Sequence, residues 1–505
     1  MNNYDVIVIG SGNSGLLSAL SLKVDGYNVL LLEANNNVGG LSKSIVKGRF
    51  EFNNILHSLF LKNKTTDRFR IDNVLSKCKI EDELRFSPLP ELCRIITPNA
   101  DYTIPFGVDN FINKMNEWFP NSEESLNTFF ELAKECREAL NYIVTNNSYL
   151  DYDHIKEYYN NFMRVSNYSI SKVLDAIGMP IDVQEVINAL WIYFGSTEIE
   201  LSFVEYAVFL LNCLEYGIQV PSEGSYSVSM SLANRYLELG GEIRLNSEVE
   251  KLLVEDNKIN GVRLVDGTII YANKVVVNSS LHNVYGKLIN HESVPRKALR
   301  NVNRRELGAK LFTVYLGLNR SAKELKLNNY SYLLYESLDS DIEASKMKQL
   351  SSSSQVALVY NNAINGVSPE GTCIISLNTL MFDELYGEAI TSDKYHRDTE
   401  NMAYRLIEYF QKCTGVRIID YIEEIKIVTP IDNIVDSDLP DGSVFGYKLK
   451  GLDNLVPRIL NKANENYVDG LYVCGGFDGD LFGYNSSFDS GMDIVNNIKK
   501  EKVGE

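Results

Sequence analysis

Three glycines near the start of the chain have a spacing that can hold phosphate groups. In VIVIGSGNSGLLSALSL, residues 6–22, Gly10, Gly12 and Gly15 follow a short run of valine and isoleucine. That run is typical of a strand buried in a parallel sheet, and helical spacing follows the glycines. Gly10 permits a tight turn, Gly12 lets the backbone approach a pyrophosphate, and Gly15 lets helix and strand pack closely. Because a helix N-terminus offers free N–H groups and a positive dipole end, we expect a pyrophosphate to bind here.

A carboxylate at the end of the next expected strand completes a dinucleotide-binding unit. The apolar segment YNVLLLEA, 27–34, carries Glu33 near its end, where a carboxylate can accept hydrogen bonds from both ribose hydroxyls. The unit alone does not separate NAD from FAD. The pair Gly39-Gly40 follows so closely that we expect a second close approach of the backbone to the cofactor.

Composition restricts the kind of protein. The chain has 505 residues, with 45% hydrophobic and 23% charged residues, which suits two or three globular domains. A formal net charge of −18 disfavours nucleic acid and anionic lipid surfaces as partners, while a local apolar or basic patch leaves peripheral membrane contact open. Seven scattered cysteines without a CxxC pair, and a first strand that leaves no room for a signal peptide, predict a cytoplasmic protein with reduced thiols. The oligomeric state stays open.

Metal and acyl-transfer chemistry have no motif in the chain. HExxH, GxSxG and cysteine pairs are all missing, so we expect no metal site. The most apolar segment, 203–220, carries Glu205 and Glu215, which predicts a buried helix rather than a membrane span. Four serines at 351–354 predict a short surface loop.

Longer motifs extend the pattern along nearly the whole chain. These are FEFNNILHSL (50–59), VPSEGSYSVSMSLANRYLELGGEIRLNSEVEKL (220–252), SPEG (368–371), SDKYHRDTENMAYRLIEYF (392–410) and TPIDNIVDSDLPDGSVFGY (429–447). Together with the glycine turn and Gly39-Gly40, they resemble the phytoene desaturase, carotenoid isomerase and retinol saturase family of FAD-dependent oxidoreductases, within the amine oxidase superfamily. The resemblance implies FAD as the cofactor.

The resemblance also implies an α/β fold, α+β overall, with a Rossmann-type FAD-binding domain of the glutathione-reductase and amine-oxidase type. Strand–glycine–helix segments at the start, middle and end of the chain predict that this domain is discontinuous, formed by 1–60, 219–290 and 440–505. The intervening segments, 61–218 and 291–439, would form a substrate-binding domain of sheet and helices. A helical subdomain is expected near 106–217.

The family's cofactor-binding residues can be carried over position by position. The pyrophosphate would lie on the glycine turn, the adenosine ribose on Glu33, the adenine on the main chain of Val249, and the flavin end on the C-terminal segment. The full set implied is Gly10, Ser11, Gly12, Gly15, Glu33, Ala34, Gly39, Gly40, Leu41, Ser42, His57, Val249, Asn278, Ser279, Gly475, Gly476, Asp478, Gly483 and Ser486.

Two positions in this set carry open alternatives. His57 is either a polar group near flavin and substrate, and so the candidate catalytic residue, or a packing histidine. Gly476 stands where the family has an aspartate on a ribityl hydroxyl; Asp478, two residues later, either replaces that acid or is a solvated turn residue, as is Asp480. The other histidines, among them His282, are expected to be incidental.

By resemblance, the chain desaturates, isomerises or saturates carbon–carbon bonds of a small, largely apolar substrate, such as a polyene, isoprenoid or lipid-like molecule, through hydride transfer at flavin N5. A transient electron donor or acceptor would assist. Two alternatives stay open: a flavin oxidase or dehydrogenase of an amine, peptide-derived or other biosynthetic intermediate, and a non-enzymatic lipid or prenyl carrier. The aromatic helices at 188–217 would either line an apolar tunnel or form plain core.

Overall fold

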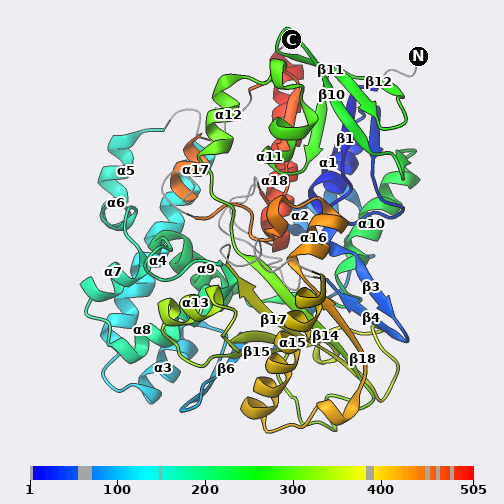
Figure 1. Cartoon of the computed structure of the whole chain (residues 1–505). Coiled ribbons are helices and arrows are strands. Elements are labelled where there is room, and N and C mark those ends of the chain that lie inside the picture. Colours follow the sequence, from blue (N-terminus) through cyan, green and yellow to red (C-terminus); the bar gives the residue numbers. More distant parts are fainter. Residues whose placement is uncertain are drawn as a thin grey trace.

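A five-stranded parallel sheet lies at the end of the molecule that holds both termini (Figure 1). The computed structural model describes residues 4–54, 71–146, 150–382, 392–449, 455–461, 467–477 and 483–504. The sheet order is β19-β13-β1-β2-β9, with all neighbours parallel. Its strands are β1 (Val6–Ile9), β2 (Val29–Leu32), β9 (Glu242–Arg244), β13 (Val275–Asn278) and β19 (Leu471–Cys474). The start, middle and end of the chain thus pair in one sheet, which confirms the predicted fold class.

The central strands are apolar at successive positions because both faces of the sheet are covered. Three helices pack on one face: α1 (Asn13–Val24), α10 (Ser225–Glu238) and α18 (Gly483–Gly504). A three-stranded antiparallel sheet covers the other face; its strands are β10 (Val249–Glu255), β11 (Lys258–Leu264) and β12 (Ile269–Tyr271). Val8 and Val6 point to the helices, whereas Ile7 points to the small sheet. The alternation fixes the register of β1 between β2 and β13.

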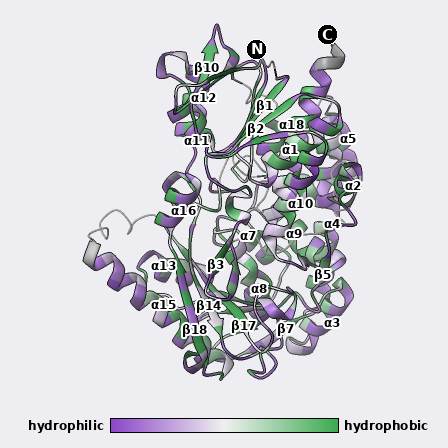
Figure 2. Cartoon of the chain, turned by 90° about the vertical axis from the view of Figure 1, so that its right-hand side faces the viewer, coloured by the Kyte–Doolittle hydropathy of each residue, from purple (hydrophilic) through white to green (hydrophobic). Residues whose placement is uncertain are grey.

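A second, seven-stranded sheet forms the lower part of the view in Figure 1. Its order is β18-β14-β17-β16-β15-β6-β7, and only the β15–β6 pair is parallel. The strands are β6 (Cys93–Ile96), β7 (Asp101–Ile104), β14 (Lys310–Leu318), β15 (Ser331–Leu334), β16 (Gln355–Val359), β17 (Cys373–Met381) and β18 (Ile422–Val428). One face packs on α15 (Ser392–Thr414), whose outer surface is hydrophilic in Figure 2.

Helices fill the stretch where helical spacing was predicted. They are α3 (Val108–Trp118), α4 (Glu123–Thr145), α5 (Tyr152–Tyr158), α6 (Asn160–Val165), α7 (Ile170–Ala176), α8 (Ile181–Asn188) and α9 (Phe203–Tyr216). The ring of Phe203 packs edge-on against Phe129, and that of Phe194 against Phe209. These aromatic side chains are therefore core, and α9 is the buried helix that the sequence predicts. Among the described residues, no helix has the length and apolar character needed to cross a lipid bilayer.

Shorter elements connect these layers. They are η1 (Gly40–Ser42), β3 (Ser44–Lys47), β4 (Phe50–Asn53), α2 (Ile71–Cys78), β5 (Phe86–Pro88), η2 (Ala189–Tyr193), β8 (Gln219–Pro221), α11 (Leu281–Asn283), η3 (Val284–Leu288), η4 (His291–Ser293), α12 (Arg296–Asn303), α13 (Ser340–Lys348), η5 (Tyr360–Asn362), η7 (Ile419–Tyr421), α16 (Pro430–Ser437), η8 (Pro440–Gly442) and α17 (Leu455–Asn461).

The serine run was wrongly predicted as a surface loop. Ser352, Ser353 and Ser354 are buried, and so is Glu343. Ser352 and Ser354 lie against the Glu343 carboxylate, and the Ser353 N–H donates to Glu336 Oε1 at 3.0 Å. Ser352 Oγ and Ser354 Oγ donate to Glu343 Oε2 at 3.0 and 2.5 Å, and Lys346 Nζ lies 3.1 Å from Glu343 Oε1. Burying a charge requires such partners, so the serines are polar packing partners and not solvated residues.

Substituting Ser354 should therefore destabilise the fold. Ser354 Oγ donates to Glu343 and accepts a hydrogen bond from the Glu336 main-chain N–H at 2.9 Å. We expect Ser354→Ala to lower stability by about 1.5–3 kcal/mol, the usual loss for a hydrogen bond to a buried charge, seen as a lower midpoint of thermal unfolding. The matched control is Ser351→Ala at the exposed end of the run, expected within about 0.5 kcal/mol of the parent. Equal midpoints for both variants would contradict the buried network.

Candidate functional site

The glycine turn, residues Gly10–Gly15, joins β1 to α1 at the carboxyl end of the parallel sheet. Gly10 has a φ of +89°, which favours glycine. A Cβ on Gly15 would overlap the carbonyl oxygen of Gly10, and one on Gly12 would lie 2.5 Å from Asn278 Oδ1. Among the described residues, no side chain caps the N-terminus of α1, so its first turn can offer N–H groups to a ligand. A helix start without a side-chain cap, next to glycines that carry no Cβ, is suited to a pyrophosphate.

The second glycine pair packs on this turn. Gly39 and Gly40 both have positive φ, and a Cβ on Gly40 would lie 3.2 Å from the Cα of Gly12. The Gly39 N–H donates to the carbonyl of Ser11 at 2.9 Å, and Asn13 Nδ2 donates to Ser42 Oγ at 2.8 Å. The segment with Leu41 and Ser42 therefore lies beside the glycine turn, as the sequence-based hypothesis of a second backbone approach requires.

Glu33 is held by the chain itself. Its Oε2 accepts hydrogen bonds from Ser11 N and Ser11 Oγ at 2.9 and 2.5 Å. Its Oε1 accepts from the main chain and side chain of Asn35 at 2.9 and 3.1 Å. The buried carboxylate thereby fixes the glycine turn to the end of β2. A bound ribose would hydrogen-bond to Glu33 in addition to, or in place of, Ser11 and Asn35. The bonds from Ser11 and Asn35 to Glu33 were not predicted from the sequence.

Val249 and Ala34 lie on the same side of the site as Glu33. The Ser247 N–H donates to the Glu33 carbonyl at 2.8 Å, and Val249 begins β10 two residues later. This places the main chain of Val249 beside the end of β2. The position is compatible with the adenine contact that the resemblance implies, which stays a prediction.

Asn278 is the point where the three distant segments meet. It ends β13, pairs with Cys474 of β19, and donates from Nδ2 to the Cys474 carbonyl at 3.2 Å. A Cβ on Gly475 would lie 2.5 Å from Asn278 Nδ2, and the Gly475 N–H donates to Ser490 Oγ of α18 at 3.1 Å. The close contact with Asn278 and the φ of +126° explain why position 475 is a glycine.

The remaining predicted residues are placed as follows. Ser279 Oγ accepts a hydrogen bond from Asn283 Nδ2 at 3.1 Å. A Cβ on Gly476 would meet no atom of the described residues within 4 Å. Gly483 and buried Ser486 belong to the first turn of α18. His57, Asp478 and Asp480 lie outside the described residues, so their roles stay predictions.

Sequence reasoning missed a polar junction between the two sheets. Asn53 Oδ1 accepts a hydrogen bond from the N–H of Ser225, the first residue of α10, at 2.8 Å, and Tyr360 donates from its hydroxyl to the Asn53 carbonyl at 2.8 Å. Tyr484 of α18 donates to the Ser225 carbonyl at 3.3 Å. Asn53 belongs to the motif FEFNNILHSL, in which only His57 was predicted to be a site residue.

His282, expected from the sequence to be incidental, is half-buried and paired inside the protein. Its Nδ1 lies 3.0 Å from the hydroxyl of Tyr447, whose ring packs edge-on against Phe477, two residues after Gly475. Burial, and then the positive charge of Arg305, lower the pKa of His282. The imidazole therefore favours its neutral form more than a free histidine does, beside the segment that carries the predicted flavin-end residues.

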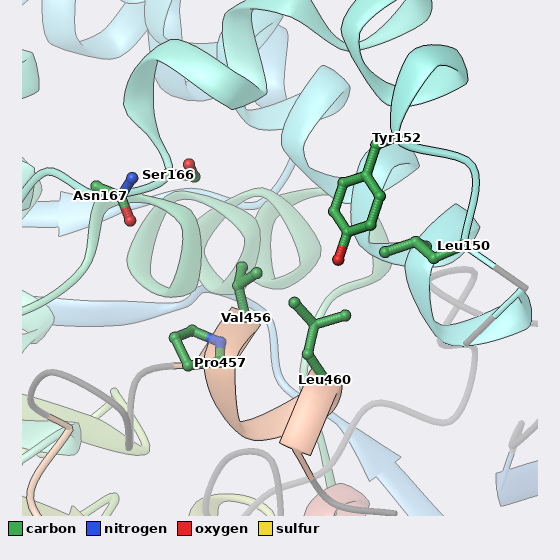
Figure 3. A pocket seen from close by; sticks show the side chains of 7 residues that line it. All are labelled: Leu150, Tyr152, Ser166, Asn167, Val456, Pro457 and Leu460. Atoms are coloured by element: carbon green, nitrogen blue, oxygen red, sulfur yellow. The ribbon is translucent and has the colours of Figure 1, made fainter. Parts of the chain in front are cut away.

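A pocket of about 530 Å³ lies away from these residues, between α17 and the helical part of the chain (Figure 3). Val456, Pro457 and Leu460 of α17 face Leu150 and Tyr152 across it. None of the predicted cofactor residues lines this pocket, so it is not the cofactor site.

Comparison with known proteins gives one family match and several relatives. The model of the family described as flavin containing amine oxidoreductase matches residues 13–417. A 4,4'-diapophytoene desaturase (4,4'-diapolycopene-forming) of Methylomonas sp is 25% identical over 63% of this chain and 62% of its own length. The all-trans-retinol 13,14-reductase of Rattus norvegicus is 24% identical over 67% of this chain and 57% of its own. The chain thus spans about three fifths of these curated relatives.

Solved structures share the fold. A putrescine oxidase triple mutant superposes with a TM-score of 0.67 at 13% identity, covering 99% of both chains. At that identity, the likeness concerns the architecture alone.

The glycine turn generates a prediction about stability. A Cβ on Gly15 would collide with backbone, which cannot move aside as a side chain can. We expect Gly15→Ala to destabilise the protein by about 3 kcal/mol or more, measured by thermal unfolding. Gly286→Ala is the matched control, because nothing lies within 4 Å of a Cβ there; it should leave the midpoint unchanged or slightly higher. A Gly15→Ala protein as stable as the control would refute the packing.

Proposed function

Because the chain belongs to the flavin containing amine oxidoreductase family, we propose that it is an FAD-dependent oxidoreductase acting on carbon–carbon bonds of a largely apolar polyene, isoprenoid or lipid-like substrate. The reaction is a desaturation, an isomerisation or a saturation. The observation that carries the proposal is the convergence at Asn278, where the glycine turn and the Gly475 segment meet at the carboxyl end of one parallel sheet. Ligands of open α/β sheets bind at that end.

We propose FAD rather than another flavin because the chain has candidate residues for the adenosine diphosphate part as well as for the flavin part. The uncapped start of α1 and the bare backbone of Gly12 suit the pyrophosphate. Glu33 lies where a ribose binds in such a unit, and Gly475, Gly476 and the first turn of α18 would hold the flavin end. The chemistry that FAD supplies when bound is hydride transfer at its N5 atom.

Aromatic side chains of the chain would exclude water from a substrate bound between the two sheets. Phe52 stacks on Tyr315 of β14 with ring centroids 5.4 Å apart, and both side chains are fully buried. Tyr447 and Phe477 close the sheet edge near His282. A dry, mostly apolar site suits a polyene and keeps water from competing for reactive carbons.

The relatives support the substrate class. One is named for desaturating diapophytoene and the other for reducing retinol; both are polyenes, and the two reactions move hydrogen in opposite directions. We therefore propose a polyene substrate and leave the direction to experiment.

The mass of the product decides between the reactions. We expect the purified protein to be yellow and its flavin to change redox state anaerobically with a polyene substrate. A product about two daltons lighter means desaturation, an unchanged mass isomerisation, and one about two daltons heavier saturation. A colourless protein that binds a lipid without flavin would instead establish the carrier alternative. Flavin reduction by amines but not polyenes would establish the oxidase alternative.

Glu33 provides a test of cofactor binding. Glu33→Ala removes the charged acceptor beside the expected ribose and frees Ser11 from the carboxylate, so we expect FAD affinity to fall roughly ten- to a hundredfold, about 1.5–3 kcal/mol. The measurement is titration of the apoprotein with FAD by flavin fluorescence.

The control for Glu33 is Glu242→Ala. Glu242, on the neighbouring strand β9, binds Tyr4 and Arg244 instead of the glycine turn. Its removal should leave FAD affinity within about twofold of the parent. If Glu33→Ala bound FAD as tightly as the parent protein, Glu33 would not be a ligand of the cofactor.

A nicotinamide nucleotide should act at most as a transient electron donor. Only one GxGxxG opens a complete strand–helix–strand unit in the sequence. We expect NADH and NADPH to separate from the protein during gel filtration while FAD stays bound. A stoichiometric nicotinamide in the protein peak would be evidence for a second nucleotide site.

A further inference from the structure

A chain of hydrogen bonds links the helices under the proposed flavin site to the seven-stranded sheet. It runs from Tyr484 to the Ser225 carbonyl, from the Ser225 N–H to Asn53, and from Tyr360 to the Asn53 carbonyl. The residue before Tyr360, Val359, donates from its N–H to the carbonyl of Tyr330 at 2.8 Å. We call these residues and their tyrosine neighbours the tyrosine junction: Asn53, Tyr193, Ser225, Tyr315, Tyr330, Tyr360 and Tyr484.

Tyrosine hydroxyls gather at this junction, and most of them are paired. Tyr193 lies 3.2 Å from Ser331 Oγ, and Tyr315 donates to Asn54 Oδ1 at 3.1 Å. Tyr360 and Tyr484 donate to main-chain carbonyls. Buried tyrosine hydroxyls usually find such partners. Tyr315, Tyr360 and Tyr484 follow this rule, whereas Tyr193 is 37% exposed.

Tyr330 is the exception. Its side chain is 3% exposed, and in the part of the chain that the structure describes its hydroxyl has no hydrogen-bond partner. Burial, and then its neighbours Tyr360, Tyr193 and Tyr484, raise the pKa of Tyr330 well above the usual value. The hydroxyl therefore keeps its proton and stays a donor.

A second unused donor lies on the same hydrogen-bond chain. Asn53 is 2% exposed, and its Oδ1 is committed to Ser225. Its Nδ2 finds no acceptor among the described residues. Leaving a buried donor unpaired costs about 1–3 kcal/mol. Tyr360 binds the Asn53 carbonyl and neighbours Tyr330, so two unpaired donors beside it point to an acceptor that the described part of the chain does not provide.

We propose that the tyrosine junction binds an oxygen atom of the substrate, with the Tyr330 hydroxyl as donor, so that the preferred substrate is an oxygenated polyene, an alcohol or ketone, rather than a hydrocarbon. This inference rests on the proposed function and narrows its substrate class. The junction joins Tyr484 of α18 to the seven-stranded sheet, so a ligand oxygen bound there would fix an apolar chain between the two sheets.

Binding of a matched ligand pair to the FAD-loaded protein tests this inference. The probes are all-trans-retinol and its deoxy hydrocarbon, which differ only in the hydroxyl, with affinities measured by quenching of protein fluorescence without oxygen. We expect retinol to bind at least about tenfold more tightly, because the hydrocarbon leaves the buried donor unpaired. In Tyr330→Phe the two affinities should come within about twofold of each other.

Stability separates a binding role from a structural one. The Tyr330 hydroxyl has no hydrogen-bond partner within the described ranges of the chain, so Tyr330→Phe should keep or raise the midpoint of thermal unfolding. Tyr335→Phe is the matched control: this buried tyrosine donates to the Ala189 carbonyl, so its loss should lower the midpoint and leave the preference for retinol intact.

Three results would overturn the inference: equal affinities for the two probes in the parent protein, an undiminished preference in Tyr330→Phe, or binding of neither probe. Failure of the proposed function would look different. Retinol would then bind with the expected preference, while the bound flavin and the mass of the polyene stayed unchanged.

Discussion

The close packing of backbone around Asn278 is the constraint on which the rest of the structure depends. A parallel sheet leaves its strand ends at one edge, and here that edge receives the glycine turn from one side and the Gly475 segment from the other. The amide of Asn278 fits only because Gly12 and Gly475 carry no side chain. It also ties β13 to β19 through Cys474. A single side chain thus sets the spacing of three segments that are far apart in sequence.

The parts of the fold that depend on neighbouring residues could be predicted from the sequence. An apolar run, a glycine turn, helical spacing and a second apolar run identified β1, α1 and β2. The same sequence of patterns identified the middle and final segments, because strand and helix periods are local properties. The short distance in sequence from β2 to Gly39-Gly40 predicted a second approach of the backbone to the cofactor. The structure agrees with both, since η1 lies against the glycine turn.

What could not be predicted depends on partners that are distant in sequence. The serines at 351–354 look solvated until the fold places the carboxylate of Glu343 among them. The hydrogen bond of His282 depends on Tyr447, and that of Asn53 depends on Ser225. In each case the residue type is uninformative, because a serine, histidine or asparagine suits a surface as well as a buried hydrogen bond. Only the tertiary fold distinguishes the two.

The order of strands in the parallel sheet has a consequence for the synthesis of the protein. β1 is translated well before its neighbour β13, which follows about 265 residues later, and β19, which pairs with β13, is translated later still. Contacts of such long sequence separation form slowly. α1 also lacks one of its packing partners until α18 has been translated. The last contacts that complete this sheet therefore join segments that the ribosome releases at widely separated times.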